Sequence, residues 1–199
     1  MGGNLASRFG SPQTTLAVAA DRLEGIGSLI HCSSLYRTAP VGLRDQPAFV
    51  NAVVALETEH TPHELLNALF DIEQAFGRDR TNSLVNGPRT LDLDLLIMDD
   101  LVITTAELVL PHPRLAERAF VLVPFAEIAP SVLHPVRRET IAQLLAQLLA
   151  HLLEAPAPEK QENFISRKKN YLPTQTVVRI GNLRAAEVHG EGPRSRNRR

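Results

Sequence analysis

Apolar residues recur at helical spacing in two long stretches of the chain, and each stretch opens on a capping signal. Residues 11–25 begin with Ser-Pro, and residues 61–77 begin with Thr-Pro-His-Glu; both stretches end at a glycine. A Ser or Thr N-cap followed by proline, with Glu three residues after the cap in the second case, is typical of a helix start. The pattern predicts a helix in each stretch, and weaker periodicity predicts two more over 114–123 and 139–153.

Strand-like patterns fill much of the remaining chain up to residue 110. Residues 28–38 and 49–56 are rich in β-branched and aromatic residues, residues 91–96 are apolar except for two aspartates, and residues 101–110 resemble a short hairpin. Residues 1–10 are loop-like, and we expect no strand in them. The order helix, strand, strand, helix, strand is that of a β-α-β-β-α-β unit whose first strand is missing, which indicates an α+β fold.

The composition of the 199 residues is that of an ordinary soluble globular protein, with 44% apolar and 22% charged residues. The formal net charge of -1 gives no global argument for nucleic acid or a membrane as a partner. Cys32 is the single cysteine, so we expect no disulfide framework and a reducing, cytoplasmic location. The most apolar run, residues 141–153, is interrupted by polar side chains and is shorter than a membrane span of roughly 20 residues.

A change of composition at residue 154 divides the chain. We expect residues 1–153 to form one domain, and residues 154–199 to form a linker and a disordered basic tail, because the latter start with an Ala-Pro repeat and end in an arginine-rich run. A tail that tethers nucleic acid or another partner is the alternative interpretation. A charge run of this kind more often only keeps a segment solvated.

Two aspartates stand out within the strand-like run over 91–96. Because strand side chains alternate, Asp92 and Asp94 project from one face and the neighbouring leucines from the other. Two such carboxylates repel each other unless a cation lies beside them, and Mg²⁺ accepts one or two carboxylates together with water and substrate phosphates. The alternative is an edge strand with a solvated acidic face, and an Asp-x-Asp pattern alone does not separate the two.

Several cationic side chains flank this pair in the chain: Arg78, Arg80, Arg89, His112 and Arg118. Carboxylates that bind magnesium, combined with several cations, are what a polyphosphate site needs, because the metal bridges phosphate oxygens while arginines stabilise the transferred and leaving groups. The chain contains neither the Gly-x-x-x-x-Gly-Lys phosphate loop nor the protein-kinase motifs. Phosphoryl chemistry in this chain would therefore use another scaffold.

A set of short motifs between residues 2 and 150 gives the chain a close resemblance to a known family. The motifs are Gly2-Gly3-Asn4-Leu5, the segment from Ser33 to Gly42, Asp45-Gln46-Pro47, Phe49-Val50-Asn51, Ile72-Glu73, Gly77-Arg78-Asp79-Arg80, the segment from Gly87 to Asp94, and the segment from Leu110 to Arg114 leading to Arg118 and Phe120. In this order they resemble the motifs of the 6-hydroxymethyl-7,8-dihydropterin pyrophosphokinase family of folate biosynthesis.

The resemblance implies a ferredoxin-like β-α-β-β-α-β sandwich with extra C-terminal helices. It implies transfer of a pyrophosphoryl group from ATP to the hydroxymethyl oxygen of the pterin, with release of AMP. It makes Asp92 and Asp94 the ligands of two Mg²⁺ ions, with the further hypothesis that Asp94 draws the proton from the substrate hydroxyl. It also implies catalytic roles for Arg78, Arg80 and Arg89. It implies ATP binding by Glu73, His112 and Arg118.

The resemblance also implies a pterin pocket formed by Thr38, Val41, Phe49, Asn51 and Phe120. The chemistry of these residues agrees, because two aromatic rings can sandwich a flat heterocycle and an amide offers a donor and an acceptor to its edge. Plain core packing is the alternative interpretation for the two phenylalanines, since buried aromatic residues usually belong to a core.

The polar loop over 79–88 is implied to be a lid that carries Arg80 over the phosphates and excludes water. Family members often have a tryptophan in this loop, but this chain has none, and Asn86 stands near that position. We therefore expect the closed lid to seal the pterin less well.

The chain departs from the family at its start, where Met1 abuts Gly2 directly and the family's first strand is not found. Loss of a central strand removes apolar contact and exposes its neighbours' edges. The alternative to an active enzyme is therefore a truncated remnant that binds nucleotide or pterin without turnover. An RNA-binding module ranks last, because the aromatic stacking pattern of such sheets is not visible. We expect a monomer that acts on ATP and a hydroxymethyl dihydropterin, with no nucleic acid and no membrane as partner.

Overall fold

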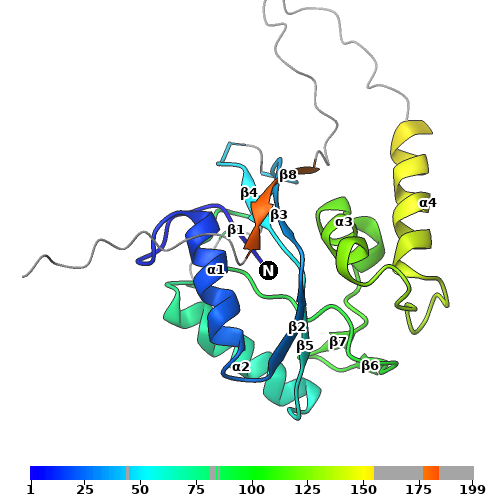
Figure 1. The fold of residues 1–199 in the computed structure, drawn as a ribbon, viewed down its shortest axis with the longest axis horizontal. Coiled ribbons are helices and arrows are strands. Elements are labelled where there is room, and N and C mark those ends of the chain that lie inside the picture. Colours follow the sequence, from blue (N-terminus) through cyan, green and yellow to red (C-terminus); the bar gives the residue numbers. More distant parts are fainter. Residues whose placement is uncertain (44, 81–83, 85, 155–176, 184–199) are drawn as a thin grey trace, which may run out of the picture.

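The computed structural model describes residues 1–43, 45–80, 84, 86–154 and 177–183. Helices and short antiparallel sheets are mixed, which confirms the α+β class (Figure 1). Helices α1 (Pro12–Leu23) and α2 (Pro62–Ala75) lie on one side of the strands, and α3 (Ala119–Ile128) and α4 (Ile141–Glu154) lie on the other side. No helix in these ranges is long and apolar enough to cross a bilayer.

The two predicted capped helices are confirmed. The Ser11 hydroxyl accepts a hydrogen bond from the backbone N–H of Thr14 at 3.3 Å at the start of α1. At the start of α2, Thr61 and Glu64 form a complete capping box, in which the Thr61 N–H donates to the glutamate at 2.8 Å. Each cap satisfies N–H groups that have no partner inside the helix.

The predicted helix over 114–123 is wrong in its bounds. A 3₁₀ turn, η1 (Leu115–Glu117), comes first, Arg118 is extended, and α3 then continues through Pro124 to Ile128. The proline removes one helical hydrogen bond, but α3 persists because Leu122 and its neighbours are buried against α4 and η1. The extended Arg118 lies between η1 and α3 and lines a pocket beside Asp94.

The main sheet has the strand order β1 (Gly2–Gly3), β4 (Phe49–Asn51), β3 (Ser34–Thr38) and β8 (Val177–Asn182), with antiparallel pairs throughout. The expectation of no strand in residues 1–10 is therefore wrong. Residue Gly2 also forms an antiparallel bridge with Asp92 on the far side of β1. Glycine permits this close fit, because a Cβ on Gly2 would lie 2.3 Å from the Asn51 Oδ1 atom.

Strand β8 lies within the segment expected to be a disordered basic tail. Residues 177–183 are described, and over 177–182 they pair with β3, so the expectation of disorder is wrong for this stretch. Leu183 is buried in the core beside α1 and α2. The linker at 155–158 and the arginine-rich end lie outside the described residues.

The two long predicted strands are each divided in two. Strand β2 (Ser28–Cys32) pairs with β5 (Val54–Glu57) in a second sheet, whereas β3 and β4 belong to the main sheet. Ser33 makes this break possible, because its N–H donates to the Val53 carbonyl and its hydroxyl accepts from the Val53 N–H, both at 2.9 Å. Where the strands diverge, the serine side chain thus replaces one backbone acceptor of the hydrogen bonds between strands.

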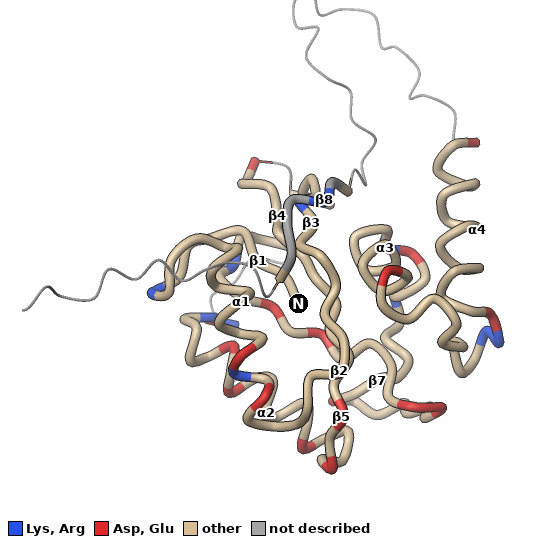
Figure 2. Tube along the Cα trace, in the orientation of Figure 1, with Lys and Arg blue, Asp and Glu red and all other residues tan. Residues whose placement is uncertain are grey.

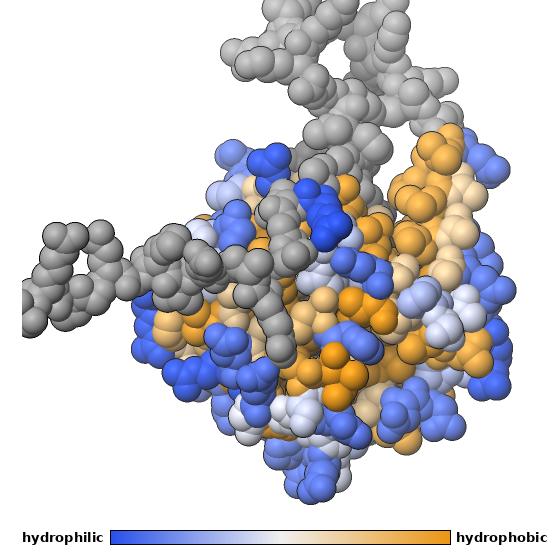
Figure 3. Space-filling view, viewed as in Figure 1, coloured by the Kyte–Doolittle hydropathy of each residue, from blue (hydrophilic) through white to orange (hydrophobic). Residues whose placement is uncertain are grey.

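The predicted hairpin over 101–110 is confirmed as β6 (Ile103–Thr104) paired with β7 (Val109–Leu110). Helix α4 was predicted over 139–153 and begins two residues later. It carries almost no charge along its length (Figure 2), and apolar side chains cover its exposed part (Figure 3). Its residues Ile141 and Leu144 pack with α3 in a second core, separate from the first core around α1 and α2.

Candidate functional site

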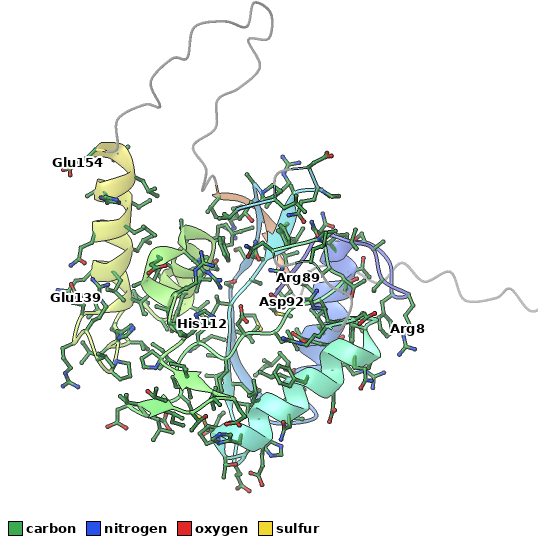
Figure 4. The ribbon with its side chains drawn as sticks, turned by 180° about the vertical axis from the view of Figure 1, so that it is seen from behind. Arg8, Arg89, Asp92, His112, Glu139 and Glu154 are labelled. Carbon is green, nitrogen blue, oxygen red and sulfur yellow. The ribbon has the colours of Figure 1, made fainter. Side chains whose placement is uncertain are left out.

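A pocket of about 240 Å³ lies between the main sheet, the run over 91–96 and the η1–α3 corner. Arg89, Asp92 and His112 gather near the middle of the molecule, whereas Glu139 and Glu154 lie at its periphery (Figure 4). Most of the predicted site residues line this pocket: Thr38, Val41, Phe49, Asn51, Arg89, Asp92, Asp94, His112, Arg118 and Phe120.

The acidic run over 91–96 behaves as an alternating extended segment, although only its bridge to Gly2 is a ladder contact. Leu91 and Leu93 are buried in the first core, and Asp92 and Asp94 face the pocket on the other side. The predicted alternation is therefore confirmed. The leucines anchor the run, and this anchoring holds both carboxylates on one wall.

Guanidinium groups offset the repulsion between these two carboxylates. The Arg89 Nη2 atom lies 3.0 Å from Asp92 Oδ2, and Arg78 Nη2 lies 3.6 Å from Asp92 Oδ1. Arg118 Nη1 lies 3.8 Å from Asp94 Oδ2, at the limit of an ion pair. Opposite charges at these distances attract, which offsets the repulsion between the two carboxylates. We call Arg89, Asp92, Asp94 and Arg118 the charged end of the pocket. Arg78 does not line the pocket and reaches it only through its pair with Asp92.

Arg89 is held in place through its backbone as well as its side chain. Its N–H donates to Asn4 Oδ1 at 2.8 Å, and its guanidinium lies 4.9 Å from the centre of the Phe49 ring. The buried Nε of Arg89 has no hydrogen-bond partner among the described residues. A buried donor of this kind is normally satisfied by a partner, so it remains available to an anion in the pocket.

Asn4 and Gln46 are positioning residues that the sequence did not single out. The Asn4 amide nitrogen donates to Gln46 Oε1 at 3.0 Å and to the Pro47 carbonyl at 2.9 Å. The Gln46 amide nitrogen donates in turn to the Asn86 carbonyl at 2.8 Å. Both residues lie in segments that resemble motifs of the family, and that resemblance was the sequence signal for a role in the site.

The predicted lid over 79–88 is described only at some positions, and residues 81–83 and 85 lie outside the described residues. Asn86 lines the pocket with a positive φ of 56°, a conformation that asparagine tolerates better than most residues. Arg80 does not line the pocket. Its guanidinium lies 4.3 Å from the centre of the Phe70 ring and pairs with Glu73.

Glu73 lies behind the acidic run instead of facing the pocket. Its side chain is 1% exposed; one oxygen accepts from the Leu93 N–H at 2.6 Å and the other from Arg80 Nε at 2.7 Å. Burial raises the pKa of this carboxyl, and the two hydrogen bonds oppose that shift. Since Leu93 sits between the two aspartates, Glu73 supports the wall that carries them.

His112 presents one nitrogen to the pocket. Its backbone N–H donates to the Leu96 carbonyl at 2.8 Å, and the Nδ1 atom of its ring accepts from the backbone N–H of Arg114 at 3.0 Å. An accepting Nδ1 places the proton of the neutral ring on Nε2. Burial lowers the pKa of His112, and the nearby Asp94 acts against that shift. The neutral ring can therefore act as a hydrogen-bond donor to a ligand.

Another part of the pocket lining is aromatic and contains an amide, and we call Thr38, Val41, Phe49, Asn51 and Phe120 the aromatic end. It adjoins the charged end, because Arg89 lies over the Phe49 ring and Arg118 over the Phe120 ring. Asn51 and Thr38 are both buried, and the Asn51 Nδ2 atom donates to Thr38 Oγ1 at 2.7 Å. This bond orients the amide, as a buried polar group in a strand requires. The pocket therefore joins a set of charges to a flat, apolar surface with one oriented amide.

The donor set of this pocket fits magnesium better than a transition metal. Among the described residues there is no group of three or more His, Cys, Asp or Glu side chains able to hold a metal ion by itself. Asp92 and Asp94 offer carboxylate oxygens on one wall. Mg²⁺ uses one or two carboxylates and completes its octahedral shell with water and substrate phosphates, so a partial set of this kind suits it.

Comparisons with known proteins agree on one family. The model of the 7,8-dihydro-6-hydroxymethylpterin-pyrophosphokinase family matches residues 1–130. A 2-amino-4-hydroxy-6-hydroxymethyldihydropteridine pyrophosphokinase of Methylorubrum extorquens is 42% identical over 146 residues, which cover 72% of this chain and 90% of that protein. The enzyme of the same name from a Synechocystis strain is 43% identical over 148 residues, covering 74% of this chain and 73% of that protein.

A longer relative shows the same match over a small part of its length. The folic acid synthesis protein fol1 of Schizosaccharomyces pombe is 37% identical over 147 residues, which cover 74% of this chain but 20% of that protein. The chain thus spans about a fifth of that relative's length, and any further activity of fol1 does not transfer to it.

Proposed function

Because the chain belongs to the 7,8-dihydro-6-hydroxymethylpterin-pyrophosphokinase family, we propose that it transfers a pyrophosphoryl group from ATP to 6-hydroxymethyl-7,8-dihydropterin. In this reaction the hydroxyl O–H bond of the pterin breaks, an O–P bond forms to the β-phosphorus, and the bond from that phosphorus to the AMP oxygen breaks. The products are the pterin diphosphate and AMP.

One observation carries the proposal: a single pocket is lined both by aromatic and amide side chains and by carboxylates paired with arginines. The pterin binds at the aromatic end, where Phe49 and Phe120 cover its faces and Asn51 meets its amide-like edge. The hydroxymethyl group then points toward Asp92 and Asp94, where the phosphates bind. This arrangement brings acceptor and donor together, and such positioning supplies much of the barrier reduction in phosphoryl transfer.

Asp92 and Asp94 would hold magnesium, and we propose two ions. When bound, magnesium neutralises phosphate charge and orients the reacting oxygens. Arg89 and Arg118 already lie beside these carboxylates and are available to share their donors with phosphate oxygens. Asp94 is the more exposed carboxylate of the two and would accept the proton of the substrate hydroxyl.

The remaining assignments rest on position. His112 donates from Nε2 to a phosphate oxygen, and Arg78 stabilises Asp92 and the transferred group. Arg80 reaches the phosphates when the lid closes, and this movement breaks its pair with Glu73. For Glu73, its burial favours a supporting role over direct contact with ATP.

The fold proposal is a ferredoxin-like sandwich. It is supported by the lateral order of the acidic run, β1, β4 and β3, with α1 between the first two strands in the chain. We further propose a cytoplasmic monomer, and the single cysteine of the chain, Cys32, fits a reducing compartment. We place the end of the catalytic domain at residue 153, with β8 packed on it from the later segment.

The test is formation of AMP from ATP and the pterin in the presence of Mg²⁺. We expect Asp92→Asn and Asp94→Asn each to reduce turnover by about 10³-fold or more, while the exposed helix residue change Asp71→Asn leaves it unchanged. Activity that survives both aspartate changes would overturn the metal assignment. Calorimetric binding of ATP or pterin to the unchanged protein with no AMP released would instead identify a non-catalytic binding protein.

A further inference from the structure

Helix α3 contains one charged side chain, Glu127, and the proposed mechanism does not use it. All the other residues of Ala119–Ile128 are apolar. Glu127 lies in the last turn of the helix, where the helix dipole disfavours a negative charge. The reason for a carboxylate at this position therefore lies outside the helix.

Glu127 accepts hydrogen bonds from the neighbouring strand β3. Its Oε1 atom accepts from the Ser34 hydroxyl at 2.6 Å, and its Oε2 atom accepts from the Ser34 backbone N–H at 2.8 Å and from the Tyr36 hydroxyl at 2.9 Å. Both donor residues are buried, whereas Glu127 itself is exposed. Hydrogen bonds to an ionised acceptor are shorter and stronger than bonds between neutral groups. We call Glu127, Ser34 and Tyr36 the α3 clamp.

The α3 clamp and the proposed active site share one face of β3. Leu35 packs in the first core on the other face of the strand, whereas Ser34 and Tyr36 reach α3. Thr38, two residues after Tyr36, belongs to the aromatic end of the pocket. Because side chains two apart on a strand point the same way, the clamp acts on the face of β3 that leads to the pocket.

The matching face of α3 carries Phe120. The spacing of Phe120 and Glu127 corresponds to about two helical turns, so both project from one side of the helix roughly 10 Å apart along its axis. Ser34 and Thr38 are separated by a similar length, about 13 Å of strand. Helix and strand therefore run side by side, with Glu127 at Ser34 and Phe120 in the pocket that Thr38 also lines.

The packing of α3 on its other neighbours is apolar. Val121, Leu122 and Phe125 belong to the second core, together with residues of α4 and η1. Apolar burial supplies stability without a preferred direction, and packed helices can slide past their neighbours by small amounts. Hydrogen bonds have restricted distances and angles. The α3 clamp thus supplies a directional contact that apolar packing does not.

We propose that Glu127 is a positioning residue for the pterin, a role that rests on the proposed function. Through the α3 clamp it fixes the position of α3 along β3, and this places Phe120, near the other end of the helix, at the aromatic end of the pocket. The acidic run over 91–96 belongs to a different segment, which is anchored in the first core by Leu91 and Leu93. Loss of the clamp should therefore weaken pterin binding and leave the charged end in place.

The first test is the steady-state kinetics of Glu127→Ala in the full chain. We expect the KM for the pterin to rise about fivefold, while kcat and the KM for ATP change by less than about twofold. Glu127→Gln keeps an acceptor for Ser34 and should recover part of the loss. Thr61→Ala removes the N-cap of α2 and should lower the Tm by a few degrees without changing the KM. An unchanged KM in Glu127→Ala, or an equal rise in Thr61→Ala, would overturn the proposal.

A double-mutant cycle tests whether the clamp acts as one unit. Tyr36→Phe removes one donor and should raise the KM for the pterin about twofold in the otherwise unchanged chain. In the Glu127→Ala chain the same change should have no further effect, because its acceptor is already absent. Full additivity of the two effects would overturn the assignment of both residues to one clamp.

The last test does not depend on turnover. In the chain labelled with 4-fluorophenylalanine, the fluorine signal of Phe120 is identified by its loss in Phe120→Leu. We expect Glu127→Ala to shift or broaden this signal without any ligand and to leave the signal of Phe70, on α2, unchanged. An unchanged Phe120 signal would overturn the positioning role. If the unsubstituted chain forms no AMP but Glu127→Ala still alters the Phe120 signal, the proposed function fails and the link from Glu127 to Phe120 stands.

Discussion

The two ends of the pocket are prepared for ligands in different ways. At the charged end, Asp92 and Asp94 are paired with arginines, so under the proposed function phosphates and metal would have to share these groups. At the aromatic end, Phe49 and the oriented Asn51 belong to a buried strand, so their positions are set before a ligand binds, and the Arg89 guanidinium lies 4.9 Å from the centre of the Phe49 ring.

This difference indicates which end of the pocket affects kcat and which end affects the KM for the pterin. Interactions that are redistributed as the reaction proceeds can act on the transition state, whereas a preformed surface binds substrate and transition state alike. Changes at the charged end should therefore lower kcat, and changes at the aromatic end should mainly raise the KM for the pterin.

After the two aspartate changes, the largest effect is expected from Arg89→Ala. Arg89 pairs with Asp92, and its buried Nε lies ready for an anion, so its loss removes charge stabilisation from the transferred group. We expect kcat to fall by about 10²–10³-fold with little change in the KM for the pterin. Steady-state AMP formation measures both, and Arg8→Ala, at the periphery, is the matched control. A change confined to the KM would contradict the division between the two ends.

Glu73→Ala tests whether the position of the acidic run over 91–96 depends on the hydrogen bond from the Leu93 N–H to Glu73. The change leaves the Leu93 N–H without its acceptor and Arg80 without its partner, and we expect a loss of about 3 kcal/mol in the free energy of unfolding. Urea unfolding measures it, with the exposed neighbour Gln74→Ala as control. Unchanged stability combined with a raised KM for ATP would instead assign Glu73 to the nucleotide.

Asn51→Ala tests the aromatic end. It removes the bond to Thr38 and the group that meets the pterin edge, and we expect the KM for the pterin to rise about tenfold while kcat changes less. The exposed Asn67→Ala serves as control. A fall in kcat as large as that of Arg89→Ala would show that the amide acts in the transition state.

The smallest effect concerns pH and His112. Because burial lowers its folded pKa below the usual 6.5, the unfolded chain takes up more protons just below that pH, and stability falls as the pH decreases through this window. We expect His112→Gln to reduce the loss of stability between pH 7.5 and 5.5 by less than about 1 kcal/mol. Urea unfolding at both pH values measures it, with His63→Gln as an exposed control. An unaltered loss would show that the imidazole titrates normally.

Local signals in the sequence were enough for the capped helices and for the alternation around Asp92. Capping boxes and side-chain alternation depend on neighbours within a few residues, so they can be predicted without tertiary contacts. The division of the strands at Ser33 depends on its bonds to Val53, twenty residues away. Strand β8 likewise depends on the edge of β3: its Val-Val-Arg-Ile run favours a strand, but nothing in the run identifies its partner.

The site shows the same limit. Asp92, Asp94 and the five residues of the aromatic end line one pocket, and their roles toward a ligand stay predictions. The family motifs did not reveal that Glu73 faces away from this pocket, because a motif fixes identity and position in the chain but not the direction of a side chain. The supporting roles of Asn4 and Gln46 were also invisible, since they consist of bonds between separate loops.

The pairing of Glu73 with Arg80 restricts how this protein can evolve. Replacing Arg80 alone leaves a carboxylate that is 1% exposed with the Leu93 N–H as its remaining described partner, and uncompensated buried charge is costly. Replacing Glu73 first with a neutral amide avoids that intermediate, so the two positions are expected to change in a preferred order. Among related sequences, a chain without Arg80 should seldom retain the glutamate.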